Sequence, residues 1–260
     1  MSFNNAPSRA DLELSHGPID PPTAQVFLAY ADEDRDLSLA AGNLSAVEAI
    51  RQLLVEAGLS LWDRDSNLGP QEDPEMAISR ATEASDNYVI LLSSHTLQNA
   101  LCLQGLLFAL SMNKRILPVL LDTVEVDHLP DPLRTITWLD LRQVSLPLAS
   151  SQGGDQLLRA LNEDAAYHHT HTQLLVQALR WERQQRHPSG LLPRAAIHRY
   201  RRWLEAAQAR QRYRPIHLQE LFIQESLRQT DTQPAELKPG PAAENGLTQI
   251  TNWLKQWIDF

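Results

Sequence analysis

Short apolar runs alternate with longer stretches of helical periodicity between residues 25 and 163, and this alternation most constrains the fold. It indicates a parallel β-sheet whose strands are joined by crossover helices. The runs are continuously apolar, which is typical of strands covered by helices on both faces. Because such crossovers are right-handed in nearly all proteins, the pattern predicts a doubly wound, five-stranded parallel sheet. The predicted strands are Val26–Tyr30, Leu59–Trp62, Asn87–Ser93, Ile116–Leu121 and Thr137–Leu141.

The helices of this predicted α/β domain, residues 25–163, lie between and after the strands. Gly58 stands just before the second strand, where a glycine commonly ends the preceding helix. The predicted helices are Leu37–Ala57, Pro74–Ala84, Leu97–Met112 and Gly154–Leu161.

Strand patterns stop near residue 163, and a helical extension, residues 164–229, follows. Its three predicted helices each carry one apolar stripe at helical spacing. Such stripes must be buried against one another or against the α/β domain. The helices are predicted at Asp164–Arg186, Leu191–Arg210 and His217–Gln229.

The two ends of the chain differ from its middle in composition. Residues 1–24 contain four prolines and no apolar period, which indicates a flexible leader. Residues 230–246 are rich in Pro, Gly and small polar residues and are interpreted as a linker. Residues 247–260 then form a strongly amphipathic pattern that predicts a terminal helix.

The predicted terminal helix places Trp253, Leu254 and Trp257 on its apolar face. Three interpretations stay open. The helix can fold back onto the body of the protein, or its two tryptophans can anchor it in the groove of a partner. Binding to a membrane surface is the third, although Lys255 is its single basic residue.

The net charge of −9 argues against general nucleic-acid binding, since phosphates are held by clustered Lys and Arg. The charge is uneven: residues 1–150 carry 9 basic and 21 acidic side chains, whereas residues 151–229 carry 12 basic and 7 acidic. Opposite signs on two segments suit docking between them, or a partner with the same asymmetry. Two ordinary solvated surfaces are an equally good interpretation.

The lone cysteine, Cys102, cannot form an internal disulfide, and the first residues show neither the basic nor the apolar region of a secretory signal. We therefore expect a cytoplasmic protein. No apolar run approaches the roughly 20 residues that a transmembrane helix needs, so we expect no transmembrane segment.

Four stretches between residues 26 and 121 carry motifs in a characteristic order. They are VFLAYADEDRD (26–36), LSLWDRDSNLGPQED (59–73), ISRATEASDNYVILLSSHTLQNALC (78–102) and NKRILPVLL (113–121). They contain a strand followed by an acidic loop, a second strand with a long loop, a helix and strand followed by a Ser-rich loop, and a fourth strand. Together they resemble the TIR domain family, although the family's Pro-Gly turn occurs in reversed order, at Gly69 and Pro70. The resemblance implies a flavodoxin-like fold.

The helical extension is also similar to known sequences. HTQLLVQALRW (171–181), LLPRAAIHRYRRWL (191–204) and RPIHLQELFIQES (214–226) resemble an extension that follows TIR domains in bacterial multidomain signalling proteins. This resemblance concerns architecture and implies no mechanism.

Many TIR domains cleave NAD at the nicotinamide–ribose bond. Catalytic members carry a glutamate three residues after the cysteine or tryptophan that follows the Ser-rich loop. Counted from Cys102, that position is Gly105, and the segment NALCLQGLLFALSMNK (99–114) contains no acid. The resemblance thus implies that the catalytic group is missing, with a gap at Gly105 on the ligand-binding edge.

NAD remains a possible ligand or substrate, and no cofactor is required. The residues that resemble a nucleotide pocket are Tyr30, Ala31, Asp32, Trp62, Arg64, Ser93, Cys102 and Gly105. Tyr30 and Trp62 can stack on a base or serve as ordinary core aromatics. Asp32, Glu33, Asp34, Glu72, Asp73 and Glu75 can supply a replacement carboxylate, although a solvated acidic rim is the simpler interpretation.

The resemblance favours protein association over catalysis. The expected partners are other TIR domains or further copies of the chain in a homo-oligomer. The interaction loop, Asp63–Pro70, is expected to expose Asp65, Asn67, Leu68 and Gly69. The alternatives are an NAD glycohydrolase that uses a non-standard carboxylate and a sensor that only binds a nucleotide.

Other chemical patterns are weak. His168, His169 and His171 lack further ligands at metal-binding spacing, so we interpret them as a solvated helical face and expect no metal. Ser93, Ser94 and His95 are adjacent in sequence and are interpreted as a loop. The glycine spacings of dinucleotide and nucleoside-triphosphate loops are absent.

Overall fold

The computed structural model describes residues 24–39, 44–125, 129–144 and 146–232. Its sheet has five parallel strands in the order β2-β1-β3-β4-β5. From β1 the strand order runs one way to β2 and the other way through β3, which confirms the predicted doubly wound fold. The strands are β1 (Ala24–Ala29), β2 (Leu61–Asp63), β3 (Ser85–Leu92), β4 (Arg115–Leu120) and β5 (Leu139–Asp140).

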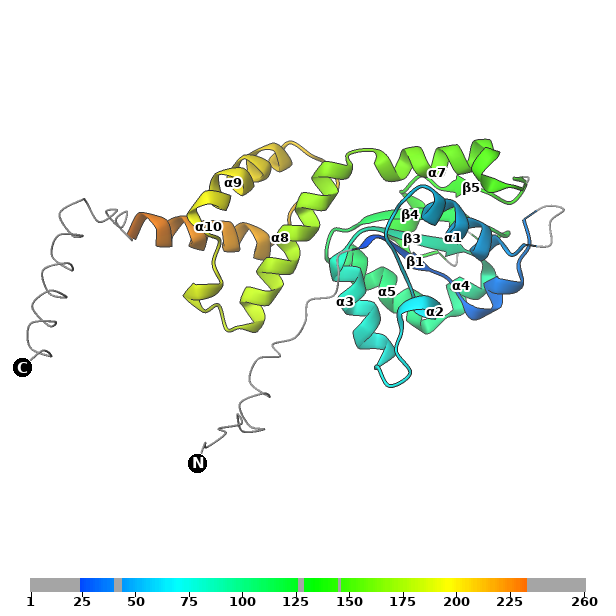
Figure 1. The fold of residues 1–260 in the computed structure, drawn as a ribbon, viewed down its shortest axis with the longest axis horizontal. Coiled ribbons are helices and arrows are strands. Elements are labelled where there is room, and N and C mark those ends of the chain that lie inside the picture. Colours follow the sequence, from blue (N-terminus) through cyan, green and yellow to red (C-terminus); the bar gives the residue numbers. More distant parts are fainter. Residues whose placement is uncertain (1–23, 40–43, 126–128, 145, 233–260) are drawn as a thin grey trace, which may run out of the picture.

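Helices cover both faces of the sheet (Figure 1). Side chains alternate between the faces along each strand. On β1, Val26 and Leu28 pack in one layer while Phe27 and Ala29 pack in the other. The first layer contains α1 (Ala46–Glu56), the 3₁₀ turn η3 (Leu148–Ser150) and α7 (Gln152–Asn162). The second contains α3 (Pro74–Ala84), α5 (Ala100–Ser111) and α6 (Asp131–Arg134).

The first helix begins at Ala46 rather than at the predicted Leu37. Ser45 caps it, because its hydroxyl accepts a hydrogen bond from the Glu48 amide at 3.1 Å. The residues before it form the 3₁₀ turn η1 (Asp32–Asp36) and then an antiparallel bridge between Ser38 and Ser45. Gly58 follows the end of α1 with a φ of 73°, as its expected role requires.

The predicted helix Leu97–Met112 is divided into α4 (Ser94–Gln98) and α5. Asn99 starts α5, since its side chain accepts a hydrogen bond from the Cys102 amide at 3.1 Å. Ser93 caps α4 in the same way through the Thr96 amide. Ser94 and His95 therefore lie in a helix, and their interpretation as a loop was wrong.

Three longer helices form the extension, namely α8 (Ala165–Arg183), α9 (Arg194–Gln208) and α10 (His217–Thr232). The short turn η4 (Pro188–Gly190) joins the first two. As predicted, their apolar stripes are buried together, with Trp181, Tyr200 and Phe222 among the residues of this separate core. In addition, α8 packs against β3 and α3 (Figure 1).

The predicted outer segments lie largely outside the described residues. Ala24 of the predicted leader is the first residue of β1, and α10 continues to Thr232, within the predicted linker. The terminal helix with Trp253, Leu254 and Trp257 is outside the described part of the chain. No helix in the described ranges is long and apolar enough to cross a bilayer.

Candidate functional site

The strand order reverses between β1 and β3, so the loops that follow these strands diverge at one edge of the sheet. Ligands of doubly wound proteins bind at this edge, beyond the carboxyl ends of the strands. Here it is built from Tyr30, Ala31 and Asp34 after β1 and from Ser93 after β3.

Asp34 fills the space between these two strand ends. Its carboxylate is buried and accepts hydrogen bonds from the Ala31 amide at 2.8 Å, from the Ser93 hydroxyl at 2.5 Å and from the Thr96 hydroxyl at 2.6 Å. The expectation that Asp34 lies on a solvated rim was therefore wrong. A carboxylate with three donors in a buried position joins the two loops rather than facing a ligand.

A row of three aromatic rings crosses the sheet beside this junction. Phe27 of β1 pairs in register with Trp62 of β2 and with Tyr88 of β3. The Phe27 ring stacks on Trp62 at 4.8 Å and on Tyr88 at 4.9 Å between centroids. These rings form a continuous stack across β2, β1 and β3.

The remaining cavity at this edge has a volume of about 20 Å³. Ligand pockets for molecules of nucleotide size are typically some 300–1,000 Å³, so this cavity is small by comparison. None of the described residues that line the cavity is acidic. They are Phe27, Leu28, Ala29, Tyr30, Trp62, Arg64, Ile78, Tyr88, Leu101 and Cys102.

Gly105 is buried on α5 and leaves no gap, contrary to the expectation from the sequence. A Cβ atom at this position would lie 2.7 Å from the Tyr88 hydroxyl oxygen and 3.2 Å from Cγ2 of Ile78. Tyr88 therefore occupies the volume that a side chain at position 105 would need. The Tyr88 hydroxyl donates to the carbonyl of Cys102 at 3.4 Å.

The eight pocket candidates separate into three groups in the structure. Tyr30, Trp62, Arg64 and Cys102 line the small cavity, while Gly105 packs behind it on Tyr88. Ala31 and Ser93 bind Asp34, and Asp32 points into an ion-pair network. Burial raises the pKa of the Cys102 thiol to about 12, so Cys102 is protonated and not nucleophilic at neutral pH.

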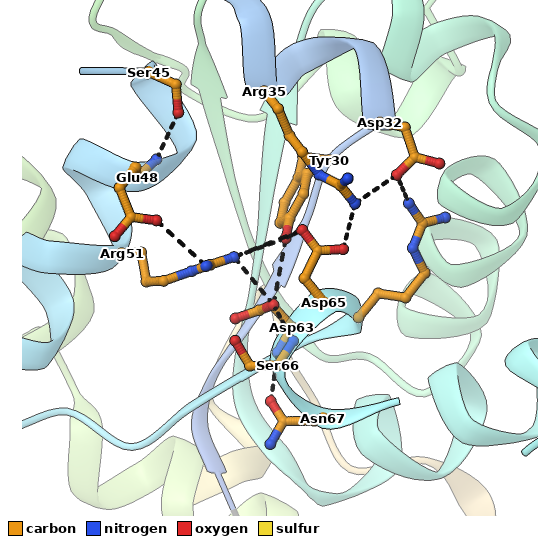
Figure 2. Close-up of polar contacts among 11 residues, drawn as sticks. Tyr30, Asp32, Arg35, Ser45, Glu48, Arg51, Asp63, Asp65, Ser66 and Asn67 are labelled. Atoms are coloured by element: carbon orange, nitrogen blue, oxygen red, sulfur yellow. Dashed lines mark hydrogen bonds and ion pairs between the residues drawn. The ribbon is translucent and has the colours of Figure 1, made fainter. Parts of the chain in front are cut away.

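The ion-pair network, here called the charged cluster, joins the ends of β1 and β2 to α1 (Figure 2). Arg51 of α1 donates to the Tyr30 hydroxyl at 2.9 Å and to Asp63 at 3.2 Å. Arg35 binds Asp32 at 2.8 Å and also Asp65, and Arg64 binds Asp32. Its members are Tyr30, Asp32, Arg35, Arg51, Asp63, Arg64 and Asp65.

Tyr30 is the centre of the charged cluster. Its hydroxyl donates to Asp65 at 2.8 Å and lies 3.3 Å from Asp63. Burial, together with the hydrogen bond to Asp65, raises the pKa of Tyr30 well above its ordinary value of 10.0. The neutral Tyr30 hydroxyl already forms its hydrogen bonds within the protein. It therefore holds the loops together and has little capacity left to bind a ligand.

A family model for the TIR domain matches residues 26–158, which is just over half of the 260 residues. The chain belongs to the TIR domain family. The matched range covers the sheet, the candidate ligand edge and the charged cluster, and it ends before α8. No curated protein shows significant similarity to the chain.

Several solved TIR structures are similar to this chain. The TIR domain of the Toll-related receptor TRR-2 from Hydra magnipapillata is 25% identical, with a TM-score of 0.38, over 45% of this chain and 84% of that one. A metazoan TIR-STING receptor from C. gigas is 20% identical, with a TM-score of 0.41, and the match covers 54% of this chain but 41% of the receptor. The TIR domains of the activated Roq1 resistosome are 15% identical, with a TM-score of 0.31, over 58% of this chain and 82% of that one.

The interaction loop of the TIR domain has a fixed base and an open tip. Asp63 is 1% exposed and caps α2 (Arg64–Asn67) by accepting a hydrogen bond from the Ser66 amide at 2.9 Å. It is thus a structural residue, not an exposed one. Asn67 and Pro70 are exposed, and Leu68 and Gly69 are half-buried. Asp65 belongs to the charged cluster, with its side chain 26% exposed.

The helical extension is fastened to the TIR domain by a buried lysine that sequence reasoning missed. Lys114, just before β4, donates through Nζ to the carbonyls of Glu83 and Ser85 at 2.7 and 2.8 Å. Its third bond is to the Thr172 hydroxyl of α8 at 3.0 Å. These three hydrogen bonds join α8 to the amino-terminal edge of the sheet, and burial lowers the pKa of Lys114 to about 7.

The histidines of α8 also lie at this contact. His168 and His171 are buried, and their interpretation as a solvated face was wrong. His169 is partly exposed and pairs with Asp86 at 3.0 Å. Among the residues described, no group of three or more His, Cys, Asp or Glu is placed to hold a metal ion.

Sequence patterns could have revealed some of these residues and not others. The spacing from Ser45 to Glu48 is that of a capping box and places the start of α1 correctly. The partners of Asp34, Arg51 and Lys114 lie on distant segments, and a single sequence carries no signal for such contacts.

Proposed function

We propose that the chain is a signalling or scaffold module that associates with other TIR domains or with copies of itself and does not cleave NAD. In this proposal it belongs to the bacterial type of multidomain signalling protein, works in the cytoplasm and uses the extension to place the TIR domain in a larger complex. The observation that supports the proposal is the close approach of Tyr88 to Gly105, which leaves no room for a side chain at the position that the resemblance assigns to the catalytic glutamate.

The chemistry of NAD cleavage supports this reading. An oxocarbenium-like transition state needs a carboxylate beside the ribose. The cavity lacks an acidic lining residue among those described, and the buried carboxylate of Asp34 already accepts three hydrogen bonds. Both observations support a role without NAD cleavage.

The charged cluster supports an association role. It fixes the base of the interaction loop through ion pairs and hydrogen bonds, and Asn67 is tied to this base because its side chain accepts a hydrogen bond from the Asp63 amide (Figure 2). A preorganised loop loses less conformational entropy when it binds a partner. The loop is therefore suited to recognition.

The catalytic part of the proposal is tested with the purified full chain and NAD in a crowded solution that favours assembly. We expect no nicotinamide release above that of a protein-free blank. Sustained turnover would overturn the proposal, and the variant Glu33→Gln, Glu72→Gln, Asp73→Asn and Glu75→Gln would then show whether an exposed carboxylate performs the reaction. Binding of NAD without turnover, measured by calorimetry, would instead favour the sensor.

The association part is tested by sedimentation of the wild-type chain and of an Asn67→Lys, Pro70→Asp variant. We expect concentration-dependent oligomers for the wild type and at least a tenfold weaker association for the variant. Gln156→Lys, on the exposed surface of α7, is a control that should assemble as the wild type does. A wild-type chain that stays monomeric, or a loop variant that assembles normally, would contradict this part.

A further inference from the structure

The outer side of α9 is an exposed basic face. Arg194, His198, Arg201 and Arg202 recur at helical spacing and are exposed, while Ile197 and Tyr200 on the inner side are buried. We call these four residues the basic face. Within the described part of the chain, Arg194 and Arg202 make no hydrogen bond or ion pair, and Arg201 pairs with Glu205 at 3.0 Å. Apart from Glu205 on α9 itself, no charged residue among those described pairs with this helix face.

Residues close to the basic face in sequence carry further positive charge. Residues 180–214 contain ten arginines, no lysine and two glutamates, a formal excess of eight positive charges. A guanidinium group can donate two parallel hydrogen bonds to one carboxylate, which an ammonium group cannot do. A surface whose charges come from arginine rather than lysine is therefore suited to a partner that presents carboxylates.

The TIR domain of the same chain presents such carboxylates. Residues 32–36 and 63–75, here called the acidic region, carry nine acidic and two basic side chains, a formal excess of seven negative charges. Ion pairs of Arg35 with Asp65 and of Arg64 with Asp32 hold its two segments together. Its exposed acids outside the charged cluster are Glu33, Asp36, Glu72, Asp73 and Glu75.

The two charged surfaces lie toward opposite ends of the sheet. The acidic region follows the carboxyl ends of β1 and β2. The extension is attached at the amino ends of β3 and β4, where Lys114 binds α8. Figure 1 shows α9 and α10 projecting away from the α/β layers on that side. Because the sheet lies between them, the two surfaces do not neutralise each other within one molecule.

We propose that the basic face of α9 docks on the acidic region of a second copy of this chain. The inference rests on the proposed function, because it names the surfaces through which copies associate. The opposite formal charges of residues 180–214, which contain the basic face, and of the acidic region support this occupant. A nucleic acid is disfavoured, since its phosphates would be repelled by the acidic region and by the net charge of −9.

The geometry of this contact determines the form of the assembly. The contact joins two different surfaces. A bound pair of copies therefore still has one free basic face and one free acidic region. Such a head-to-tail interface produces a filament or a ring. Its strength depends on salt, because exposed charges are screened over about 10 Å at 0.1 M ionic strength.

The experiment uses the full chain and two charge-reversal variants in sedimentation velocity. The basic-face variant carries Arg194→Glu, Arg201→Glu and Arg202→Glu, and the acidic-region variant carries Glu33→Lys, Asp36→Lys and Glu75→Lys. Each variant by itself is expected to associate at least tenfold more weakly than the wild type. An equimolar mixture of the two variants is expected to restore assembly, because each contact between one variant and the other again joins opposite charges. Wild-type association is expected to weaken at least tenfold between about 50 and 500 mM salt.

The control reverses three exposed arginines outside both surfaces, with Arg80→Glu, Arg142→Glu and Arg159→Glu, and should assemble normally. Circular dichroism verifies that each variant is folded. A basic-face variant that assembles as the wild type does, or a mixture that fails to recover, would overturn the inference while leaving loop-mediated association intact. Binding of a single-stranded 20-nucleotide DNA that the three arginine changes abolish would also overturn it.

Discussion

The hydroxyl oxygen of Tyr88 lies 2.7 Å from the position that a Cβ atom would take at Gly105. Tyr88 is fully buried in the row of stacked aromatic rings, so it has little freedom to move aside. Because Gly105 on α5 has no side chain, the large side chain of Tyr88 on β3 can pack against it. This pair fills the space between β3 and α5.

We predict that Gly105→Ala destabilises the protein by about 1–3 kcal/mol, as added methyl groups do in filled cores. Alanine by itself would favour the helix by about 1 kcal/mol. In a Tyr88→Phe background the loss should become smaller or change sign, because the clashing oxygen is gone. Urea unfolding of the wild type, the two single variants and the double variant forms a double-mutant cycle, which gives the coupling energy between positions 88 and 105.

Leu107→Ala, on the exposed side of the same helix, is the control for this cycle. It should show no coupling to Tyr88. If the effect of Gly105→Ala is the same with and without the Tyr88 hydroxyl, the close contact does not determine stability. Gly105→Glu should likewise yield a destabilised chain without NAD cleavage, since the added side chain has no space on this edge.

Among the acids of the loop after β1, Asp34 should be the one whose substitution lowers the free energy of unfolding most. We predict that Asp34→Ala costs about 3 kcal/mol or more, because three buried donors lose a charged acceptor. Asp36→Ala removes an exposed acid of the same turn and should change the free energy of unfolding by less than about 0.5 kcal/mol. Chemical denaturation of both variants measures this difference, and equal losses would contradict the role given to Asp34.

The contact between α8 and the TIR domain should weaken in mild acid. Burial lowers the pKa of both His168 and His171 to about 3, against an ordinary value of 6.5. The folded state therefore binds fewer protons than the unfolded state between these values, and stability is lost as the pH falls below 6.5. At pH 5 each histidine should lower the free energy of unfolding by about 2 kcal/mol.

Unfolding curves recorded between pH 7 and pH 5 test this expectation. The double variant His168→Phe, His171→Phe keeps aromatic side chains at both positions and should flatten the pH dependence in this range. His198→Asn changes an exposed histidine of α9 and should leave the dependence as it is. A slope that persists in the double variant would assign the effect to other groups.

Cys102 should react slowly with thiol reagents in the native protein. Its thiol is buried, and burial raises its pKa to about 12, so the reactive thiolate is rare at neutral pH. Labelling by a chromogenic disulfide at pH 8 should be at least a hundredfold slower than in the same protein unfolded in denaturant. Equal rates in the two states would show that this edge of the sheet opens readily.

Local patterns were sufficient to predict the sheet. Continuous apolar runs marked the five strands, and Gly58 marked the end of α1, because these features follow from the burial and backbone freedom of individual residues. The first residue of a helix was predicted less well where a capping side chain determines it. Ser45 and Asn99 each begin a helix at a position that periodicity alone had placed elsewhere.

The sequence by itself determined the fold class, the helical extension and the absence of an acid near position 105, since each follows from the order and type of neighbouring residues. The tertiary structure alone decided that Tyr88 occupies the space beside Gly105, that Asp34 is buried between two loops and that the histidines of α8 are enclosed. Each of these depends on segments far apart in the chain. Their contacts are set by packing in three dimensions, which no local pattern of residues encodes.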